Sequence, residues 1–216
     1  MKSNIILKKG RYWNQRKQRI FWKKAINNWA KALEDYAENI FSTRDKSQGY
    51  YFDERANLGF LFLALHKAKA KALLQEFETI RIKKGKRKKS WGRCDLYAKI
   101  GSHDYYFEAK QIWPYTANSL ETEYNASIKE AKTQLKSIAE ARGTKTKKII
   151  AVFIVLDLSQ KEYDSKKKEG FKSFLTEIEK IYDKNENVLI AKFFPDKAAE
   201  WDHRFYPGIF LVLNKI

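Results

Sequence analysis

The clearest structural signal in this chain is a pair of segments, GRCDLYA at residues 92–98 and YYFEAKQ at residues 105–111. Both segments alternate residues as half-buried β-strands do, because successive side chains of a strand point to opposite faces. Gly101 lies between them and favours a tight turn. The pattern therefore predicts an antiparallel hairpin with strands at about residues 93–100 and 105–112.

Charged residues interrupt these otherwise apolar strands. Glu108 and Lys110 are two residues apart, so they share one face of their strand, and Asp95 faces them if the two strands pair. Two carboxylates beside an ammonium suit Mg²⁺ or Mn²⁺, which prefer oxygen ligands and activate water for phosphodiester hydrolysis. The alternative interpretation is an ion pair of Lys110 with Glu108 or Asp95 on a solvent-facing sheet.

Hydrophobic periodicity predicts the other elements. Helices are expected at about residues 13–42, 53–75, 119–142 and 168–183, and further strands at about residues 77–82, 148–158, 187–194 and 207–214. A strand meander, then a crossover helix and a parallel strand, gives a mixed β-sheet flanked by helices. We therefore expect an α/β fold with a long N-terminal helix. We expect the chain to form a single domain over residues 1–216, with a helical extension at 1–45 and an α/β core at 50–216.

Composition narrows the class of partner. The 216 residues hold 44 Lys and Arg against 26 Asp and Glu, a formal net charge of +18, which favours polyanionic partners. The longest apolar stretch, Leu58 to Leu65, is too short to span a bilayer, so nucleic acid is favoured over a membrane. The first residues lack the apolar core of a secretion signal, and the single cysteine, Cys94, excludes an intrachain disulfide. A cytoplasmic protein is expected.

Two basic regions are candidates for contact with nucleic acid. The first is a lysine-rich loop and the strand start after it: Lys83, Lys84, Lys86, Arg87, Lys88, Lys89 and Arg93. The second is the first helix, whose basic residues are interleaved with aromatic ones, among them Trp13 and Trp22. The regular helical spacing of these aromatics favours packing in the core over contact with nucleic acid. The basic face of this helix remains a candidate for phosphate contact, or a solvated surface.

The hairpin resembles the PD-(D/E)xK nuclease superfamily, which has the restriction-endonuclease-like fold. The resemblance extends from about Glu54 to Phe194 and implies that Asp95, Glu108 and Lys110 form a site for Mg²⁺ or Mn²⁺. It also implies that Gln111 helps to line the site. The chain departs from the family pattern where Cys94 replaces the proline of the motif. It departs again after Gln134, where Ile138 stands in place of a tyrosine found in an exonuclease branch.

Glu54 has two interpretations. The resemblance makes it a candidate third metal ligand, since a helix before the first core strand often adds an acidic residue. An acidic residue at a helix start is also favoured by the helix dipole without any metal.

The resemblance implies a metal-dependent nuclease acting on DNA, most simply an endonuclease. Cutting both strands needs two sites or two passes, so a homodimer is plausible. The first helix, with Trp22 and Trp29, could form its interface or cover the sheet. The alternatives are a catalytically silent fold of this type that binds nucleic acid or assembles with other proteins, and an RNA-processing enzyme.

Overall fold

A mixed seven-stranded β-sheet forms the centre of the computed structural model, which describes residues 5–40, 53–82, 89–139, 145–169, 171–195 and 198–216. Its strands lie in the order β1-β7-β10-β5-β4-β3-β2, and only β4 and β5 run parallel among these pairs. The bounds are β1 Ile5–Lys8, β2 Ala72–Ile82, β3 Lys89–Ile100, β4 His103–Ile112, β5 Lys145–Val155, β7 Val188–Phe193 and β10 Ile209–Lys215. The predicted hairpin and the parallel strand after it are confirmed.

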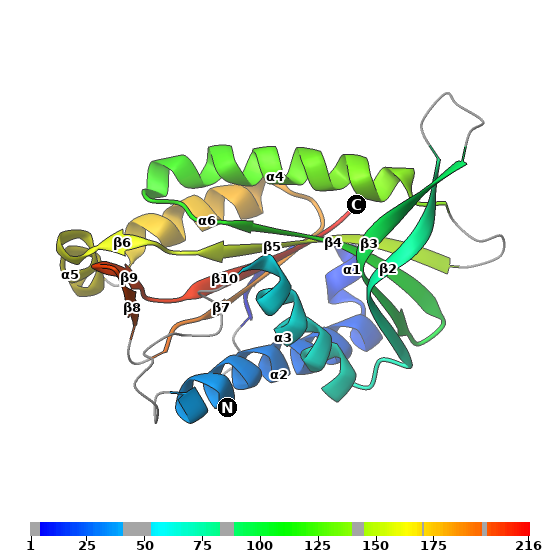
Figure 1. Ribbon diagram of the computed structural model, residues 1–216, viewed down its shortest axis with the longest axis horizontal. Helices are drawn as coiled ribbons and strands as arrows, with labels where there is room; N and C mark the ends of the chain where they lie inside the picture. The colour runs from blue at the N-terminus through cyan, green and yellow to red at the C-terminus, as the bar shows by residue number, and fades with distance from the viewer. Residues whose placement is uncertain (1–4, 41–52, 83–88, 140–144, 170, 196–197) are drawn as a thin grey trace.

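Helices cover both faces of this sheet (Figure 1). One face carries α1 (Arg11–Asn14), α2 (Arg16–Ile40) and α3 (Glu54–Lys67), and the other carries α4 (Ala117–Ser137) and α6 (Lys172–Lys184). At one end, α5 (Gln160–Lys168) adjoins a small second sheet of β6 (Leu158–Ser159), β9 (Arg204–Tyr206) and β8 (Ala199–Trp201). The predicted α/β class, with a mixed sheet, flanking helices and a long N-terminal helix, is confirmed.

The tryptophans of the first two helices lie inside the molecule. Trp13, Trp22 and Trp29 are at most 1% exposed and belong to the core between α2, α3 and the sheet. Burying a large apolar side chain contributes roughly 1.5–3 kcal/mol, so these residues fix the helix on the sheet. The prediction that the aromatics pack in the core is confirmed for them. Trp22 and Trp29 thus cover the sheet and are unavailable to a dimer interface.

The candidate strand β4 lies against one of the most apolar strands of the sheet. Residues 149–155 of β5 are fully buried because helices cover both of its faces. In the parallel register, Glu108 is level with Ile150 and Lys110 with Val152. Glu108 and Lys110 are therefore level with residues of β5 that have no polar side chain.

The second helix is shorter than the sequence pattern predicts. It ends at Lys67 instead of continuing to residue 75, and residues 72–82 form β2. Lys69 takes a left-handed conformation with φ 73°, and the Ala70 N–H bonds back to the Leu65 carbonyl, which closes the helix. Leu73 and Leu74 continue the apolar spacing beyond this stop, so periodicity alone extended the helix too far.

Other boundaries also differ. The predicted helix at 168–183 corresponds to α6, which begins at Lys172 after the left-handed Phe171 (φ 57°), whereas α5, which precedes it, was not predicted. A capping box at Ser159 and Glu162 starts α5, a mostly polar helix that hydrophobic periodicity does not reveal. Strands β1, β6, β8 and β9 were not predicted, because two to four residues give too few alternations to recognise. Among the described residues, no helix is both long and apolar enough to cross a membrane.

Candidate functional site

Asp95 and Glu108 meet where β3 and β4 separate. Within the described strands, their pairing ends at Leu96 opposite Phe107, so the next pair in register would be Asp95 and Glu108. Instead of a backbone pair, the Asp95 carboxylate accepts a hydrogen bond of 2.7 Å from the Ala109 N–H. The side chain thus replaces a missing rung of the ladder and is held beside Glu108.

The alternation of β4 places Glu108 as predicted. Phe107 and Ala109 belong to the core under α2 and α3, and Ile112, on the same strand face as Glu108 and Lys110, belongs to the core under α4. On β3 the alternation breaks next to Asp95. Cys94 packs in the core under α4, whereas Leu96 and Ala98 pack in the core under α2 and α3. Cys94 is buried as expected, but not on the face of Leu96.

Glu108 is the most unusual residue of the site. Its side chain is almost fully buried, and its Oε2 atom has no hydrogen-bond partner among the described residues. The closest cation is the Arg81 guanidinium, whose Nη2 lies 3.8 Å from this oxygen. Burial and then the nearby Asp95 raise the pKa of Glu108 to about 8, although Arg81 and Lys110 act in the opposite direction. Burial also raises the pKa of Asp95.

Lys110 reaches the same area but has another partner. Its Nζ forms an ion pair of 2.9 Å with Oε1 of Glu130 on α4. Burial lowers the pKa of Lys110, but the hydrogen bond to Glu130 and the charges of Glu54, Glu130 and Glu108 outweigh it and raise the pKa overall. Glu130 was not anticipated, because it lies on a helix that is remote in sequence.

Glu54 and Gln111 join the site in different ways. Asp53 caps the start of α3, and the carboxylate of Glu54 in its first turn accepts a hydrogen bond from the Gln111 backbone. Burial raises the pKa of Glu54, Lys110 lowers it and Asp95 raises it again, so Glu54 interacts with the site as well as with its helix. The Gln111 side chain points away, with its Oε1 accepting a 2.8 Å hydrogen bond from Asn57 of α3.

Most of the candidate basic loop lies outside the described residues. This holds for Lys83, Lys84, Lys86, Arg87 and Lys88. Lys89 is exposed at the start of β3. The guanidinium of Arg93 is exposed and ion-paired to Glu76, whose other oxygen is 2.8 Å from Nε of Arg55. Arg93 is therefore held on the surface beside the site.

Arg81 was missed by sequence reasoning. It donates hydrogen bonds to the Gln134 carbonyl (2.9 Å), to Oγ of Ser137 (3.1 Å) and to the Arg93 carbonyl, and so joins β2, β3 and α4 beside Glu108. The available signal was its position on the face of β2 shared with Phe77 and Thr79. A cation on a strand face that is partly buried requires nearby acceptors.

Gly92 leaves room for this arginine. A Cβ atom at position 92 would collide with Cδ and Nε of Arg81, so only glycine lets the side chain cross β3. Gly92, the first residue of the predicted hairpin segment, is thus required for packing and not for a turn.

The donor set fits a small divalent cation held by few protein ligands. Asp95 and Glu108 offer only oxygen, and Oε2 of Glu108 accepts no hydrogen bond from the described residues, with the Arg81 guanidinium 3.8 Å away. In the described part of the chain, no group of three or more His, Cys, Asp or Glu side chains is arranged to hold a metal ion. Mg²⁺ commonly keeps several waters and needs only one or two carboxylates, so two carboxylates suffice.

No protein-family model, no curated protein and no solved structure matches this chain. The function is therefore argued from the residues and the geometry of this site.

Replacing Gly92 with alanine should displace Arg81 and loosen the junction of β2, β3 and α4. We expect Gly92→Ala to lower the free energy of unfolding by about 1–3 kcal/mol, as overpacking does. Urea denaturation followed by circular dichroism measures this change.

The matched control is Gly59→Ala on α3. No atom lies within 4 Å of a Cβ at position 59, so alanine should stabilise the helix by about 0.5–1 kcal/mol. Equal effects of the two substitutions would contradict the packing role of Gly92.

Glu108→Gln should change how stability depends on pH in metal-free protein. Wild type keeps Glu108 protonated when folded up to pH about 8, whereas the unfolded chain releases this proton near the usual glutamate pKa of 4.5. The stability that the protonated carboxyl contributes is therefore complete below pH 4.5 and is lost as the pH rises through about 8.

The variant should thus gain stability over wild type between these two pH values, by on the order of a few kcal/mol. Urea denaturation at several pH values, with a chelator present, measures the difference. Glu78→Gln, on the exposed part of β2, shows what loss of a surface carboxylate alone does. If the difference in unfolding free energy between wild type and Glu108→Gln does not vary with pH, Glu108 is not held protonated.

Proposed function

We propose that this chain is a metal-dependent nuclease of the PD-(D/E)xK type, which hydrolyses phosphodiester bonds of DNA as an endonuclease. The observation that carries the proposal is the buried Glu108 carboxylate beside Asp95, with one oxygen unpartnered among the described residues. Burying a carboxylate beside a second one is unfavourable unless a cation joins them or one of them stays protonated. Lys110 does not lie between them, since it pairs with Glu130, and the Arg81 guanidinium is 3.8 Å from Oε2 of Glu108.

Asp95 and Glu108 would hold Mg²⁺ or Mn²⁺. Glu54, at the start of α3, is influenced by the charge of Asp95 but does not form a three-carboxylate group with the pair among the described residues. When bound, the ion supplies a Lewis acid for a phosphoryl oxygen and lowers the pKa of a bound water. With the ion bound, Glu108 would lose its proton and both carboxylates would be ionised, because the ion would balance their charge. The Ala109 N–H keeps the Asp95 carboxylate in place through its 2.7 Å hydrogen bond.

Lys110 would act on the phosphate or on the attacking water. Its Nζ can donate to a phosphate oxygen or take part in moving the proton of the water. Glu130, its partner, is 62% exposed on its side chain, so this ion pair contributes little and a phosphate can replace it. Arg81 would keep its hydrogen bonds to α4 and β3, 3.8 Å from Oε2 of Glu108.

The order of elements supports the nuclease-like interpretation at the level of the fold. Helix α3, the meander of β2, β3 and β4, the crossover helix α4 and the parallel strand β5 follow one another as the resemblance requires. The acidic residues lie on the second and third strands of the meander. The restriction-endonuclease-like identity of the fold is part of the proposal.

A silent fold that binds nucleic acid is the second candidate. It is favoured by the ion pair of Lys110 with Glu130 and by the hydrogen bond that already engages Asp95. In that case, Glu108 would simply stay protonated. The two candidates differ in whether divalent metal ions bind and whether DNA is cut.

Asp95→Asn should abolish cleavage of plasmid DNA in Mg²⁺ or Mn²⁺ while leaving the protein folded. The amide keeps the shape of the side chain but removes the charge that holds the ion against its hydration shell. Lys110→Ala should keep metal binding and lose rate by roughly 10²–10⁴-fold. Gel assays on plasmid, linear duplex, single-stranded DNA and RNA measure the activity and its substrate.

Asp104→Asn is the matched control for these variants. Asp104 is also a buried carboxylate of β4, but it bonds to Tyr97 at 2.7 Å and Lys99 at 3.0 Å outside the site. Its loss should reduce stability and leave cleavage in place. Full cleavage by well-folded Asp95→Asn would refute the site, and no cleavage by wild type would favour the silent candidate.

Metal-free DNA binding should depend strongly on salt. With a formal net charge of +18, the chain should bind duplex DNA through phosphates and release counterions. We expect the affinity to fall by about tenfold or more between about 50 and 200 mM NaCl, measured by fluorescence anisotropy. An affinity that does not change with salt would be inconsistent with a polyanion partner.

A further inference from the structure

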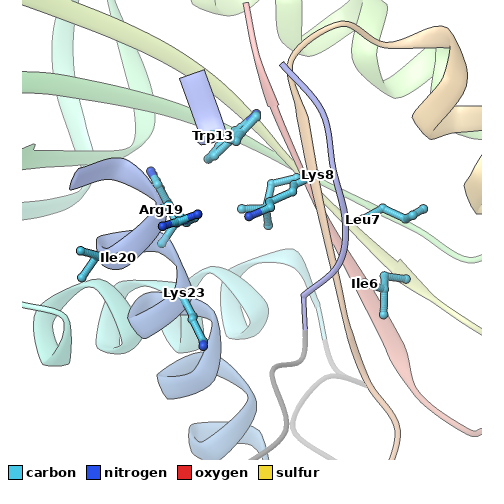
Figure 2. Close-up of a pocket in the computed structure, with 9 residues that line it drawn as sticks. Ile6, Leu7, Lys8, Trp13, Arg19, Ile20 and Lys23 are labelled. Atoms are coloured by element: carbon cyan, nitrogen blue, oxygen red, sulfur yellow. The ribbon is translucent and has the colours of Figure 1, made fainter. Parts of the chain in front are cut away.

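A second site is formed between the N-terminal strand and the first turns of α2. A pocket of about 530 Å³ lies between β1 and α2, and its walls include Trp13 of α1 and Leu189 of β7. It shares no residue with the candidate metal site. Figure 2 shows Lys8 extending from β1 toward α2 and Arg19 extending from α2 into the same space, whereas Leu7 points to the other side of the strand.

Basic side chains without acidic partners among the described residues line the pocket. Lys8, Arg19 and Lys23 line it, and no carboxylate of the described residues does. None of the three forms an ion pair with any residue in the described ranges. Like charges that face one space repel each other unless an anion lies between them. The site is therefore suited to a ligand with more than one negative charge.

The rest of the wall is apolar. Ile20, which is 60% exposed, and Leu189 lie beside the cations. Trp13 is only 1% exposed, and its indole N–H has no hydrogen-bond partner among the described residues. A volume of 530 Å³ lies within the range for small-molecule ligands and is far more than a phosphate ion needs.

We propose that this pocket binds a nucleotide unit, with its phosphate held by Lys8, Arg19 and Lys23 and its sugar and base against the apolar wall. A phosphate monoester carries a charge of about −1.5 to −2 and three acceptor oxygens, which match several cations better than a single carboxylate does. The choice of a nucleotide among phosphate ligands rests on the proposed nuclease function. The anionic preference of the pocket does not depend on it.

A neighbouring hollow indicates how a longer ligand would continue. It shares Ile20 and Lys23 with the pocket and extends along α2 past Lys24 to Asn27 and Asn28. Within the described chain, Oδ1 of Asn27 and Nδ2 of Asn28 are buried atoms without hydrogen-bond partners. A strand whose terminal nucleotide occupies the pocket could therefore run along α2, whereas a free nucleotide would use the pocket alone.

The test is calorimetric titration of the full chain, with a chelator present, using thymidine monophosphate, inorganic phosphate, octanoate and an oligothymidylate of about six nucleotides. Thymidine monophosphate should bind more tightly than phosphate or octanoate, and should change the tryptophan fluorescence through Trp13. The double variant Arg19→Gln, Lys23→Gln should weaken its binding by about tenfold or more. Both residues are exposed, so the fold should be kept.

Lys17→Gln is the matched control, because Lys17 is exposed on the same helix and does not line the pocket. Its effect should be within about twofold. Lys24→Gln separates the two sources of the nucleotide. Weaker oligothymidylate binding with unchanged thymidine monophosphate binding assigns the pocket to a strand, and no effect on either assigns it to a free nucleotide.

The proposal is overturned if thymidine monophosphate does not bind, if Lys17→Gln weakens binding as much as the double variant, or if octanoate binds more tightly. If wild type binds the nucleotide but cuts no DNA, the pocket proposal stands and the nuclease proposal fails. If wild type cuts DNA but binds no thymidine monophosphate, the nuclease proposal stands and the pocket proposal fails.

Discussion

The burial of the Glu108 carboxylate beside Asp95 is the constraint that the surrounding structure has to satisfy. Glu108 lies on β4 between apolar strands, and burial raises its pKa to about 8. A charged carboxylate here is unfavourable in isolation, so the cations around it matter. Arg81 lies 3.8 Å from Oε2, too far for a hydrogen bond, and Lys110 is paired with Glu130. Among the described residues, no cation therefore donates a hydrogen bond to Oε2 of Glu108.

Several unrelated features of the fold serve to hold this pair in place. The separation of β3 and β4 frees the Ala109 N–H, which Asp95 then binds. Gly92 lets Arg81 cross β3 and bind the end of α4. The start of α3 brings Glu54 to the same end of β4 through the Gln111 backbone. Helices from both faces of the sheet therefore converge on one pair of carboxylates.

The sequence predicts the architecture well where hydrophobic patterns are long. The hairpin around Gly101, the long helix α2 and the strands β5, β7 and β10 follow directly from alternation or helical spacing. The pattern failed at α3, because the left-handed Lys69 ends the helix inside an apolar run. It also missed β1, whose four residues pair with β7 only through the tertiary fold.

The site was predictable only in part, because some of its contacts join elements that are distant in sequence. Strand alternation places Glu108 and Lys110 on one face, and the structure agrees. The partner of Lys110 could not be foreseen, because Glu130 is on a helix whose packing on β4 sets the contact. Arg81 required knowledge that β2 lies beside β3 and that Gly92 leaves space for it. Contacts between elements depend on packing, which local sequence does not encode.

The central claim is that Asp95 and Glu108 form a divalent metal site, and Mn²⁺ titration by calorimetry tests it most directly. Performing the titration near pH 7 in two buffers of different ionisation enthalpy also counts the protons released. The account predicts one saturable site in wild type, release of up to about one proton because folded Glu108 is protonated, and loss of the site in the double variant Asp95→Asn, Glu108→Gln. No Mn²⁺ binding by wild type, or equal binding by the double variant, would contradict it.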